Sequence, residues 1–213
     1  MKRRRVGQPR LFFLWVVECI LTWYNFHKEA EMKCLVFLAD GFEECEALVT
    51  VDLLRRAGIH TDMVSISDHF TVHGSHGVDV SADLLLKDVD VSTYDVVVLP
   101  GGKVGTANLD KSDTVKAAVL AHYKAGKLTC AICAAPSVLG HLGILKDKNY
   151  TCFPSFHDES FGGKFMMVPA VADGNVVTGR GMSASLEFAR EILKKLIPDS
   201  DLAKVEYGVQ YYR

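Results

Sequence analysis

A cysteine, Cys133, stands where an apolar run gives way to small residues. Residues 128–132 have the composition of a buried strand, and the Ala134-Ala135-Pro136 that follows suits a first helical turn, where the missing N–H of proline is no loss. This layout is that of a nucleophile elbow with sulfur in place of a hydroxyl. A helix N-terminus favours a thiolate, so we expect the pKa of Cys133 to fall below about 8.5. The alternative is a small buried apolar side chain without chemistry.

A glycine pair follows a second apolar run, residues 95–99, in the sequence Pro100-Gly101-Gly102. Glycines there let the backbone approach a ligand and present N–H donors to an anion. Together with the N–H of Ala134 they would form an oxyanion hole. A plain loop after a strand is the alternative, because a glycine pair alone is a weak signal.

Three acidic residues, Glu43, Glu44 and Glu46, follow the first apolar run. Carboxylates at a helix start ordinarily interact favourably with the helix dipole. One of them would act differently if it pointed over the sheet edge toward Cys133. Held protonated there, it would hydrogen-bond the thiolate and serve as a general acid or base.

The elements that must position these residues alternate between apolar runs and amphipathic stretches. Such alternation predicts a parallel sheet with helices on both faces, and ligands of such sheets bind beyond the carboxyl ends of the strands. We expect strands, one hairpin and helices at the following residues. The strands are 34–39, 61–66, 95–99, 128–132 and 175–178, the hairpin is 69–80, and the helices are 44–57, 112–125, 134–142 and 183–196.

Composition excludes several classes of protein. A chain of 213 residues with 49% hydrophobic and 23% charged residues is globular rather than disordered. A formal net charge of -2 favours neither nucleic acid nor an anionic membrane surface as a partner. Six cysteines without regular spacing favour a reducing compartment over a disulfide framework, so we expect a cytoplasmic protein.

The N-terminus has a different character. Basic residues at positions 2–5 precede an apolar run from Leu11 to Phe26, which resembles a signal peptide or signal anchor. The run contains Glu18, is shorter than the ~20 residues of a spanning helix, and lacks a clear cleavage site. Met32 directly precedes the first strand, so translated upstream sequence without a function is the favoured interpretation. We expect an extension at 1–31 and one domain at 32–213, with a membrane partner only if the extension is a real anchor.

Three competing motifs are less favoured. Cys130-x-x-Cys133 matches a redox pair, but residues three apart in a strand point to opposite faces. His157-Asp158-Glu159 resembles the His-x-Glu of a glutamine amidotransferase, which expects a glycine-flanked cysteine. His73 and His76 suit a solvated hairpin better than a metal site, and we expect no metal.

Four motifs together resemble the DJ-1/PfpI (ThiJ) family. They are GFEECE at 41–46, YDVVVLPGG at 94–102, AICAAP at 131–136 and GRGMSASLEFA at 179–189, in the family's order and spacing. The resemblance covers residues 32–213 and implies a flavodoxin/Rossmann-like three-layer α/β sandwich with a mostly parallel sheet. By motif match, Cys133 takes the position of the nucleophile and Glu46 that of its carboxyl partner. Gly101, Gly102, Ala134 and Arg180 match positions that surround the sulfur.

The resemblance also implies a function. It suggests a homodimeric, cofactor-independent enzyme that acts on small aldehydes or dicarbonyls such as methylglyoxal, of glyoxalase III or deglycase type. The alternative is an oxidative-stress sensor or chaperone in which Cys133 is oxidised. Phe153, where some members carry histidine, and the tyrosine-rich end resemble the bacterial branch. Ala134, where protease-like members carry histidine, argues against the protease subgroup.

Overall fold

A computed structural model describes residues 32–211, and the extension expected at 1–31 lies outside the described residues. The central sheet has seven strands in the order β10-β11-β7-β6-β1-β2-β5. Neighbouring strands pair in parallel except β10, which runs antiparallel to β11. The strand bounds are Lys33–Leu38 for β1, His60–Ser65 for β2, Leu84–Leu85 for β5, Val96–Leu99 for β6, Leu128–Ile132 for β7, Ala170–Asp173 for β10 and Val176–Gly179 for β11. The predicted mostly parallel α/β architecture is confirmed.

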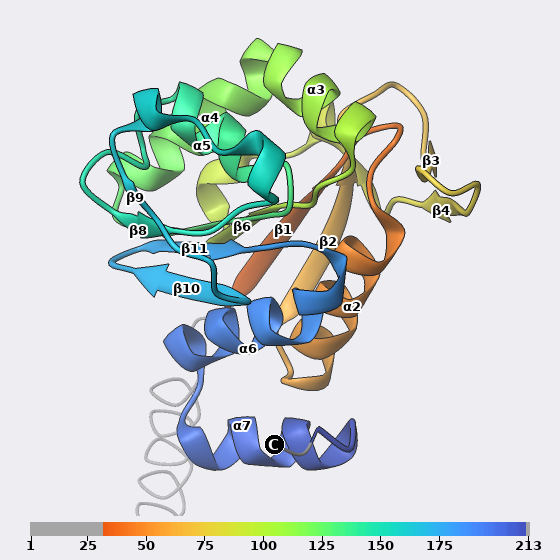
Figure 1. Cartoon of the computed structure of the whole chain (residues 1–213). Helices are drawn as coiled ribbons and strands as arrows, with labels where there is room; N and C mark the ends of the chain where they lie inside the picture. Colours follow the sequence, from red (N-terminus) through yellow and green to blue (C-terminus); the bar gives the residue numbers. More distant parts are fainter. Residues whose placement is uncertain (1–31, 212–213) are drawn as a thin grey trace, which may run out of the picture. The chain divides into compact units, whose positions relative to one another are not determined.

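Helices cover both faces of this sheet (Figure 1). Alternate side chains of β1 show why, since Cys34, Val36 and Leu38 pack in one core layer and Leu35 and Phe37 in the other. Residues of α2, α6 and α7 contribute to the first layer, and residues of α3, α4 and α5 to the second. The helix bounds are Glu44–Arg56 for α2, Lys103–Lys111 for α3, Asp113–Lys124 for α4, Pro136–His141 for α5, Ser185–Leu196 for α6 and Asp199–Gly208 for α7.

Two helices were absent from the sequence expectations. α3 follows Gly102 without a side-chain cap, and Gly105 lies within it, so its start carries no conventional signal. Pro198 follows the end of α6, as its expected helix-stopping effect predicts. The same residue is also the N-cap of α7. Arg190 of α6 joins the two helices by an ion pair with Glu206.

Short elements complete the described chain. β3 and β4 form the expected antiparallel hairpin, and β8 and β9 form a small parallel pair. Five single 3-10 turns lie between the larger elements. The bounds are Thr71–His73 for β3, Asp79–Ser81 for β4, Asn149–Tyr150 for β8, Lys164–Phe165 for β9, Leu86–Asp88 for η1, Val91–Thr93 for η2, Pro154–Phe156 for η3, Glu159–Phe161 for η4 and Met182–Ala184 for η5. No helix among residues 32–211 has the length and apolar character needed to cross a bilayer.

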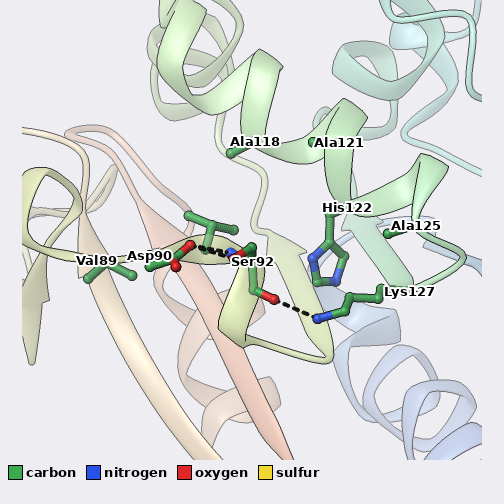
Figure 2. A pocket seen from close by; sticks show the side chains of 9 residues that line it. Val89, Asp90, Ser92, Ala118, Ala121, His122, Ala125 and Lys127 are labelled. Carbon is green, nitrogen blue, oxygen red and sulfur yellow. Dashed lines mark hydrogen bonds between the residues drawn. The ribbon is translucent and has the colours of Figure 1, made fainter.

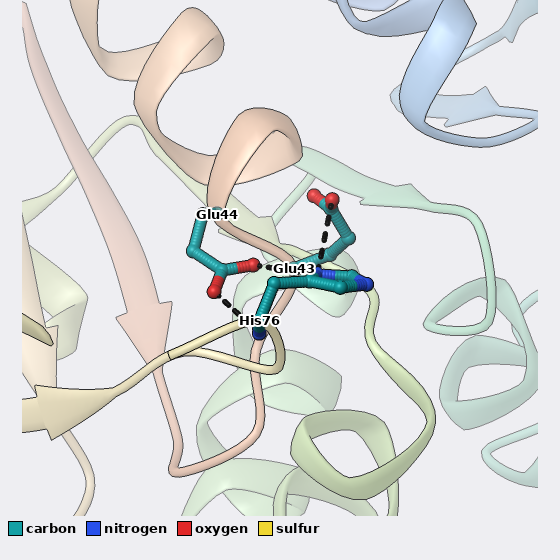
Figure 3. Close-up of side chains that lie close together, drawn as sticks. All are labelled: Glu43, Glu44 and His76. Atoms are coloured by element: carbon teal, nitrogen blue, oxygen red, sulfur yellow. Dashed lines mark hydrogen bonds and ion pairs between the residues drawn. The ribbon is translucent and has the colours of Figure 1, made fainter. Parts of the chain in front are cut away.

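The β3–β4 hairpin is attached to the start of α2 through one carboxylate, Glu44 (Figure 3). Glu44 is 6% exposed and accepts hydrogen bonds from the His76 N–H at 2.6 Å and from the Ser75 hydroxyl at 3.1 Å. Burial raises the pKa of Glu44, but hydrogen bonds from its own N–H, from His76 and from Ser75 outweigh burial and lower it to about 2. The carboxylate therefore holds the hairpin loop at Ser75 and His76 against the start of α2, the helix that also carries Glu46.

Glu44→Gln should lower the free energy of unfolding at pH 7 by about 1–2 kcal/mol, because bonds to an ionised acceptor become bonds to a neutral one. A depressed pKa stabilises the fold above the unfolded value of 4.5, and this contribution is lost as pH falls through about 2. Urea unfolding measured from pH 7 to pH 3 should show the difference between variant and wild type shrinking below pH 4.5. Glu159→Gln, at a side chain 97% exposed, is the control and should change little. A difference independent of pH would contradict this role for the Glu44 charge.

Candidate active site

Four neighbouring strands, β11, β7, β6 and β1, bring four loops to one edge of the sheet. All four run in parallel, so their carboxyl ends meet there. The loop after β1 leads to Glu46, the loop after β6 holds Gly101 and Gly102, β7 is followed by Cys133, and β11 is followed by Arg180. The edge also contains the point where the chain reverses direction across the sheet, since β2 and β6 lie on opposite sides of β1.

Cys133 occupies a sharp turn between β7 and α5. Its φ of 63° lies in the left-handed region, which residues other than glycine rarely adopt. The turn is held by two backbone bonds, from the Cys133 N–H to the Gly179 carbonyl at 2.9 Å and from the Phe153 N–H to the Cys133 carbonyl at 2.7 Å. The backbone N–H groups of Gly102 and Ala134 lie near enough to the sulfur to lower the pKa of the thiol in part. The two backbone bonds hold the half-buried thiol at the sheet edge.

Glu46 is completely buried beside this thiol. Its Oε2 accepts the Gly101 N–H at 2.9 Å, and the Cys133 side chain lies near enough to the carboxyl group to lower its pKa in part. Oε1 has no nitrogen or oxygen partner among residues 32–211. Gly101 is required for this approach, because a Cβ there would collide with Glu46 Oε2 and lie 2.6 Å from the Cys133 Cβ.

Burial raises the pKa of both groups. Desolvation, the Glu46 charge and the Glu46 hydrogen bond raise the pKa of Cys133 to about 12, against the Gly102 and Ala134 N–H groups, which lower it. Desolvation raises the pKa of Glu46 to about 7. The expected fall in the thiol pKa is therefore wrong, because burial and an adjacent carboxylate outweigh two N–H donors. Between these values the pair holds one proton and one negative charge, and both titration steps belong to the pair.

Arg180 and Gly181 follow β11 on the same edge. The Arg180 N–H donates to the Pro169 carbonyl at 2.9 Å, and within the described part of the chain its half-buried side chain makes no ion pair. Gly181 is the residue that sequence reasoning missed, although it lies within the GRGMSASLEFA motif. A Cβ at Gly181 would lie 3.9 Å from the Cys133 sulfur and 3.7 Å from the Phe153 ring. Gly181 and Phe153 therefore flank the thiol.

Cys130 lies within β7 and is completely buried. Both Cys130 and Cys133 are free thiols, and both adjoin the core layer formed with α2 and α6. The opposite-face argument for these two residues is wrong, because Cys133 has left the strand and strand alternation does not apply to it. Burial and the nearby Cys34 raise the pKa of Cys130 well above its usual range, so it stays protonated.

Two other sequence motifs are accounted for by their own contacts. His157 Nδ1 lies 2.6 Å from the Tyr150 hydroxyl, and its ring stacks on Phe165 with centroids 4.4 Å apart. Glu43, Glu44 and His76 lie close together (Figure 3), and one ligand-type atom of each lies within 4.8 Å of the others. The hairpin donors already occupy both oxygens of Glu44, so hydrogen bonding explains this cluster without an ion.

Comparison with known proteins identifies relatives of this arrangement. The Parkinson disease protein 7 homolog of Danio rerio is 36% identical over 181 residues, which cover 83% of this chain and 96% of the relative. Protein dj-1beta of Drosophila melanogaster is 34% identical over 179 residues, with the same two coverages. The matched region spans only 38% of Protein DJ-1 homolog B of Arabidopsis thaliana, at 34% identity and 78% of this chain.

Solved structures match the fold over nearly the whole described chain. A mutant of a DJ-1 superfamily protein from Salmonella typhimurium is 35% identical with a TM-score of 0.81, covering 85% of this chain and 100% of its own. The Drosophila melanogaster DJ-1beta structure is 33% identical with a TM-score of 0.80, covering 86% of this chain and 100% of its own. The model of the DJ-1/PfpI family matches residues 32–195. Over that region, which contains the four motifs and the loops around Cys133, this chain belongs to the DJ-1/PfpI family.

Proposed function

We propose that this chain is a cofactor-independent enzyme in which Cys133 attacks small dicarbonyls such as methylglyoxal. The observation that carries the proposal is a thiol beside a completely buried carboxyl group, both packed against Gly101, in which burial raises the pKa of the carboxyl to about 7. Such a pair supplies both a nucleophile and a proton shuttle. A protein of Thermococcus kodakarensis that is named a deglycase is 29% identical over 167 residues, which adds support for carbonyl chemistry.

The first step would be addition to the aldehyde. Cys133 first passes its proton to the Glu46 carboxylate, and the thiolate then forms a C–S bond to the aldehyde carbon while the carbonyl π electrons move to oxygen. Glu46 then gives its proton to that oxygen, which produces a hemithioacetal. The N–H groups of Gly102 and Ala134, which already face the sulfur, would stabilise the negative charge as it passes to the adjacent oxygen.

The second step would rearrange this adduct without net oxidation. The Glu46 carboxylate removes the proton from the former aldehyde carbon and returns a proton to the neighbouring carbon. The electrons that bound the first proton end in the new C–H bond of the second carbon, and the hydroxyl proton of the hemithioacetal passes to the second carbonyl oxygen, so a thioester of a 2-hydroxy acid results. Water hydrolyses the C–S bond and restores the thiol. The sum is dicarbonyl plus water to 2-hydroxy acid, which needs no external oxidant.

The proposal also includes a substrate-binding residue, an oligomeric state and a location in the cell. Arg180, beside Gly181 on the β11 loop, would bind the oxygen of the second carbonyl. We propose a homodimer in the cytoplasm that acts on free dicarbonyls, or on their adducts with proteins in the manner of a deglycase.

A redox role is a second candidate. One solved relative, 32% identical with a TM-score of 0.79, is described as Toxoplasma gondii DJ-1 in an oxidized form. Peroxide would take the electron pair of the Cys133 sulfur and lose water or hydroxide, and a second equivalent would give a sulfinate. The same N–H donors and a protonated Glu46 would hold its oxygens.

Cys133→Ser should abolish methylglyoxal turnover, because a serine hydroxyl has no comparably acidic proton to give to Glu46. Cys130→Ser makes the same atom exchange at the buried thiol three residues away and is the matched control. It should retain most turnover while losing about 1–2 kcal/mol of stability, since it buries a hydroxyl in an apolar layer. Loss of lactate production should be measured beside urea unfolding. Equal loss in both variants would revive the redox pair and contradict the single-thiol mechanism.

Glu46→Gln should reduce turnover by about 10²–10⁴-fold, because the amide keeps the shape but cannot shuttle a proton. Cys133 should still react with iodoacetamide, since alkylation needs only the thiolate.

The pH dependence of that alkylation separates the two groups. In the wild type, the pair is neutral below about 7 and carries one negative charge above it, so the alkylation rate should rise through pH 7. In Glu46→Gln the rise at pH 7 should vanish. A single rise should remain, at a thiol pKa below about 12, because the Glu46 charge and hydrogen bond that raise the pKa of Cys133 are gone. A step at pH 7 that persists in the variant would assign it to another group.

A further inference from the structure

The absence of a side chain at Gly181 leaves room beside the Cys133 sulfur. A Cβ on Gly181 would lie 3.9 Å from the sulfur and 3.7 Å from the nearest carbon of the Phe153 ring. Among residues 32–211, no other heavy atom outside Gly181 and its two chain neighbours comes within 4 Å of that point. Both distances are ordinary van der Waals contacts, so the position has room for one methyl group.

The residues on either side of this position are held by backbone hydrogen bonds. The Gly181 carbonyl accepts the Ala184 N–H at 2.8 Å. The Phe153 N–H donates to the Cys133 carbonyl at 2.7 Å, and the Phe153 carbonyl accepts the Phe156 N–H at 2.8 Å. Phe153 is 48% exposed, and its ring meets the Phe156 ring edge-on with centroids 6.5 Å apart. Phe153 therefore presents an apolar surface beside the thiol.

A substrate bonded to the sulfur would reach this position with its third atom. Bond lengths of about 1.5 Å and bond angles of about 111° place the third atom of a chain roughly 3–4 Å from the sulfur. In the methylglyoxal adduct, the third atom is either the methyl carbon or the oxygen of the second carbonyl group. Neither the Phe153 ring nor a sulfur that has formed a C–S bond donates a hydrogen bond, so the position suits the methyl group better than the oxygen.

Another apolar hollow is too far away to hold this methyl group. A groove of about 340 Å³ lies between α4 and the chain around η2, lined in part by Val89 and Ala118 (Figure 2). It reaches Lys127, which precedes the five-residue strand β7, whereas Cys133 follows that strand. At ~3.3 Å per residue, the strand separates Lys127 from Cys133 by roughly 17 Å. A three-carbon substrate bonded to the sulfur does not span that distance.

We propose that Gly181 and Phe153 determine substrate specificity by holding the substituent of the second carbonyl carbon between them. This inference rests on the proposed attack of Cys133 on a dicarbonyl. It assigns as the substrate class the 2-oxoaldehydes that carry one small apolar substituent, with methylglyoxal preferred to glyoxal. The same placement leaves the second carbonyl oxygen for the Arg180 side chain.

Gly181→Ala tests this placement, because its methyl group would occupy the position of the substrate methyl group. The φ of Gly181 is 164°, an extended backbone that any residue adopts, so the variant should unfold in urea as the wild type does. The ratio of kcat/KM for methylglyoxal to kcat/KM for glyoxal should fall about tenfold or more, because glyoxal carries only hydrogen there. Phe153→Ala should lower the same ratio about fourfold, since the methyl group loses its apolar contact.

Gly208→Ala is the matched control. It makes the same substitution at a glycine of α7 where an added Cβ would meet no atom of the described residues within 4 Å. The ratio of the two kcat/KM values should be unchanged in this variant.

Alkylation of Cys133 tests the same position without enzymatic turnover. Chloroacetone and chloroacetaldehyde each form a C–S bond as the thiol loses its proton and chloride leaves. The two adducts differ only in the methyl group on the second carbon. With rates followed by intact mass and corrected by those of glutathione, Gly181→Ala should lower the ratio of the chloroacetone rate to the chloroacetaldehyde rate about tenfold.

The two measurements separate this inference from the proposed enzymatic function. If the wild type turns over neither dicarbonyl but the alkylation ratio falls in Gly181→Ala, the enzymatic proposal fails and the position of the substituent stands. An alkylation ratio that is equal in the wild type and in Gly181→Ala would overturn the inference, whatever the turnover. A turnover ratio that Gly181→Ala leaves unchanged would overturn it as well.

Discussion

One hydrogen bond, from the Gly101 N–H to Glu46 Oε2, connects the two halves of the site. It joins the first turn of α2 to the loop after β6, and these belong to segments 55 residues apart in the chain. Because Glu46 is completely buried, this donor also offsets part of the cost of placing a carboxyl group there. The Cys133 side chain lies against the same side of this glycine, so the positions of thiol, carboxyl and backbone donors are all set by how closely α2 approaches that loop.

The loop before α2 is held from the opposite direction by the hairpin. The Gly41 N–H donates to the His73 carbonyl at 2.7 Å, and the Ser75 N–H donates to the Phe42 carbonyl at 2.8 Å. Glu44 adds its ionised carboxylate to the same contact. Two glutamates in the first turn of one helix thus have opposite environments: several hydrogen-bond donors keep Glu44 ionised, whereas Glu46, with one backbone donor, retains its proton until about pH 7. The number of donors around each carboxyl, not its depth alone, decides which of the two can transfer protons.

Patterns of local composition predicted most of the fold. Strands buried on both faces, such as Val96–Leu99, are unbroken apolar runs, and Ser112 caps α4 through a hydrogen bond to the Val115 N–H, as its type suggests. The pattern could not predict α3, whose start depends on Gly102 at a φ of 88° packed against the Gly41 loop. In the site, parallel strand ends explain why Cys133, Gly102 and Glu46 meet. The titration of the thiol could not be read from sequence, because it depends on how much water the surrounding loops exclude.

The left-handed backbone of Cys133 places stability and chemistry in opposition at one residue. For a side chain with a Cβ this conformation costs roughly 1–2 kcal/mol relative to the right-handed one, a cost that glycine avoids. Glycine would therefore relax the turn while removing the sulfur. Selection for stability alone would therefore favour glycine at this position, and the protein would lose its reactive thiol. A laboratory screen that selected variants of this chain for thermostability alone would favour the same substitution. Its most stable variants would then lack the Cys133 thiol and its reactivity.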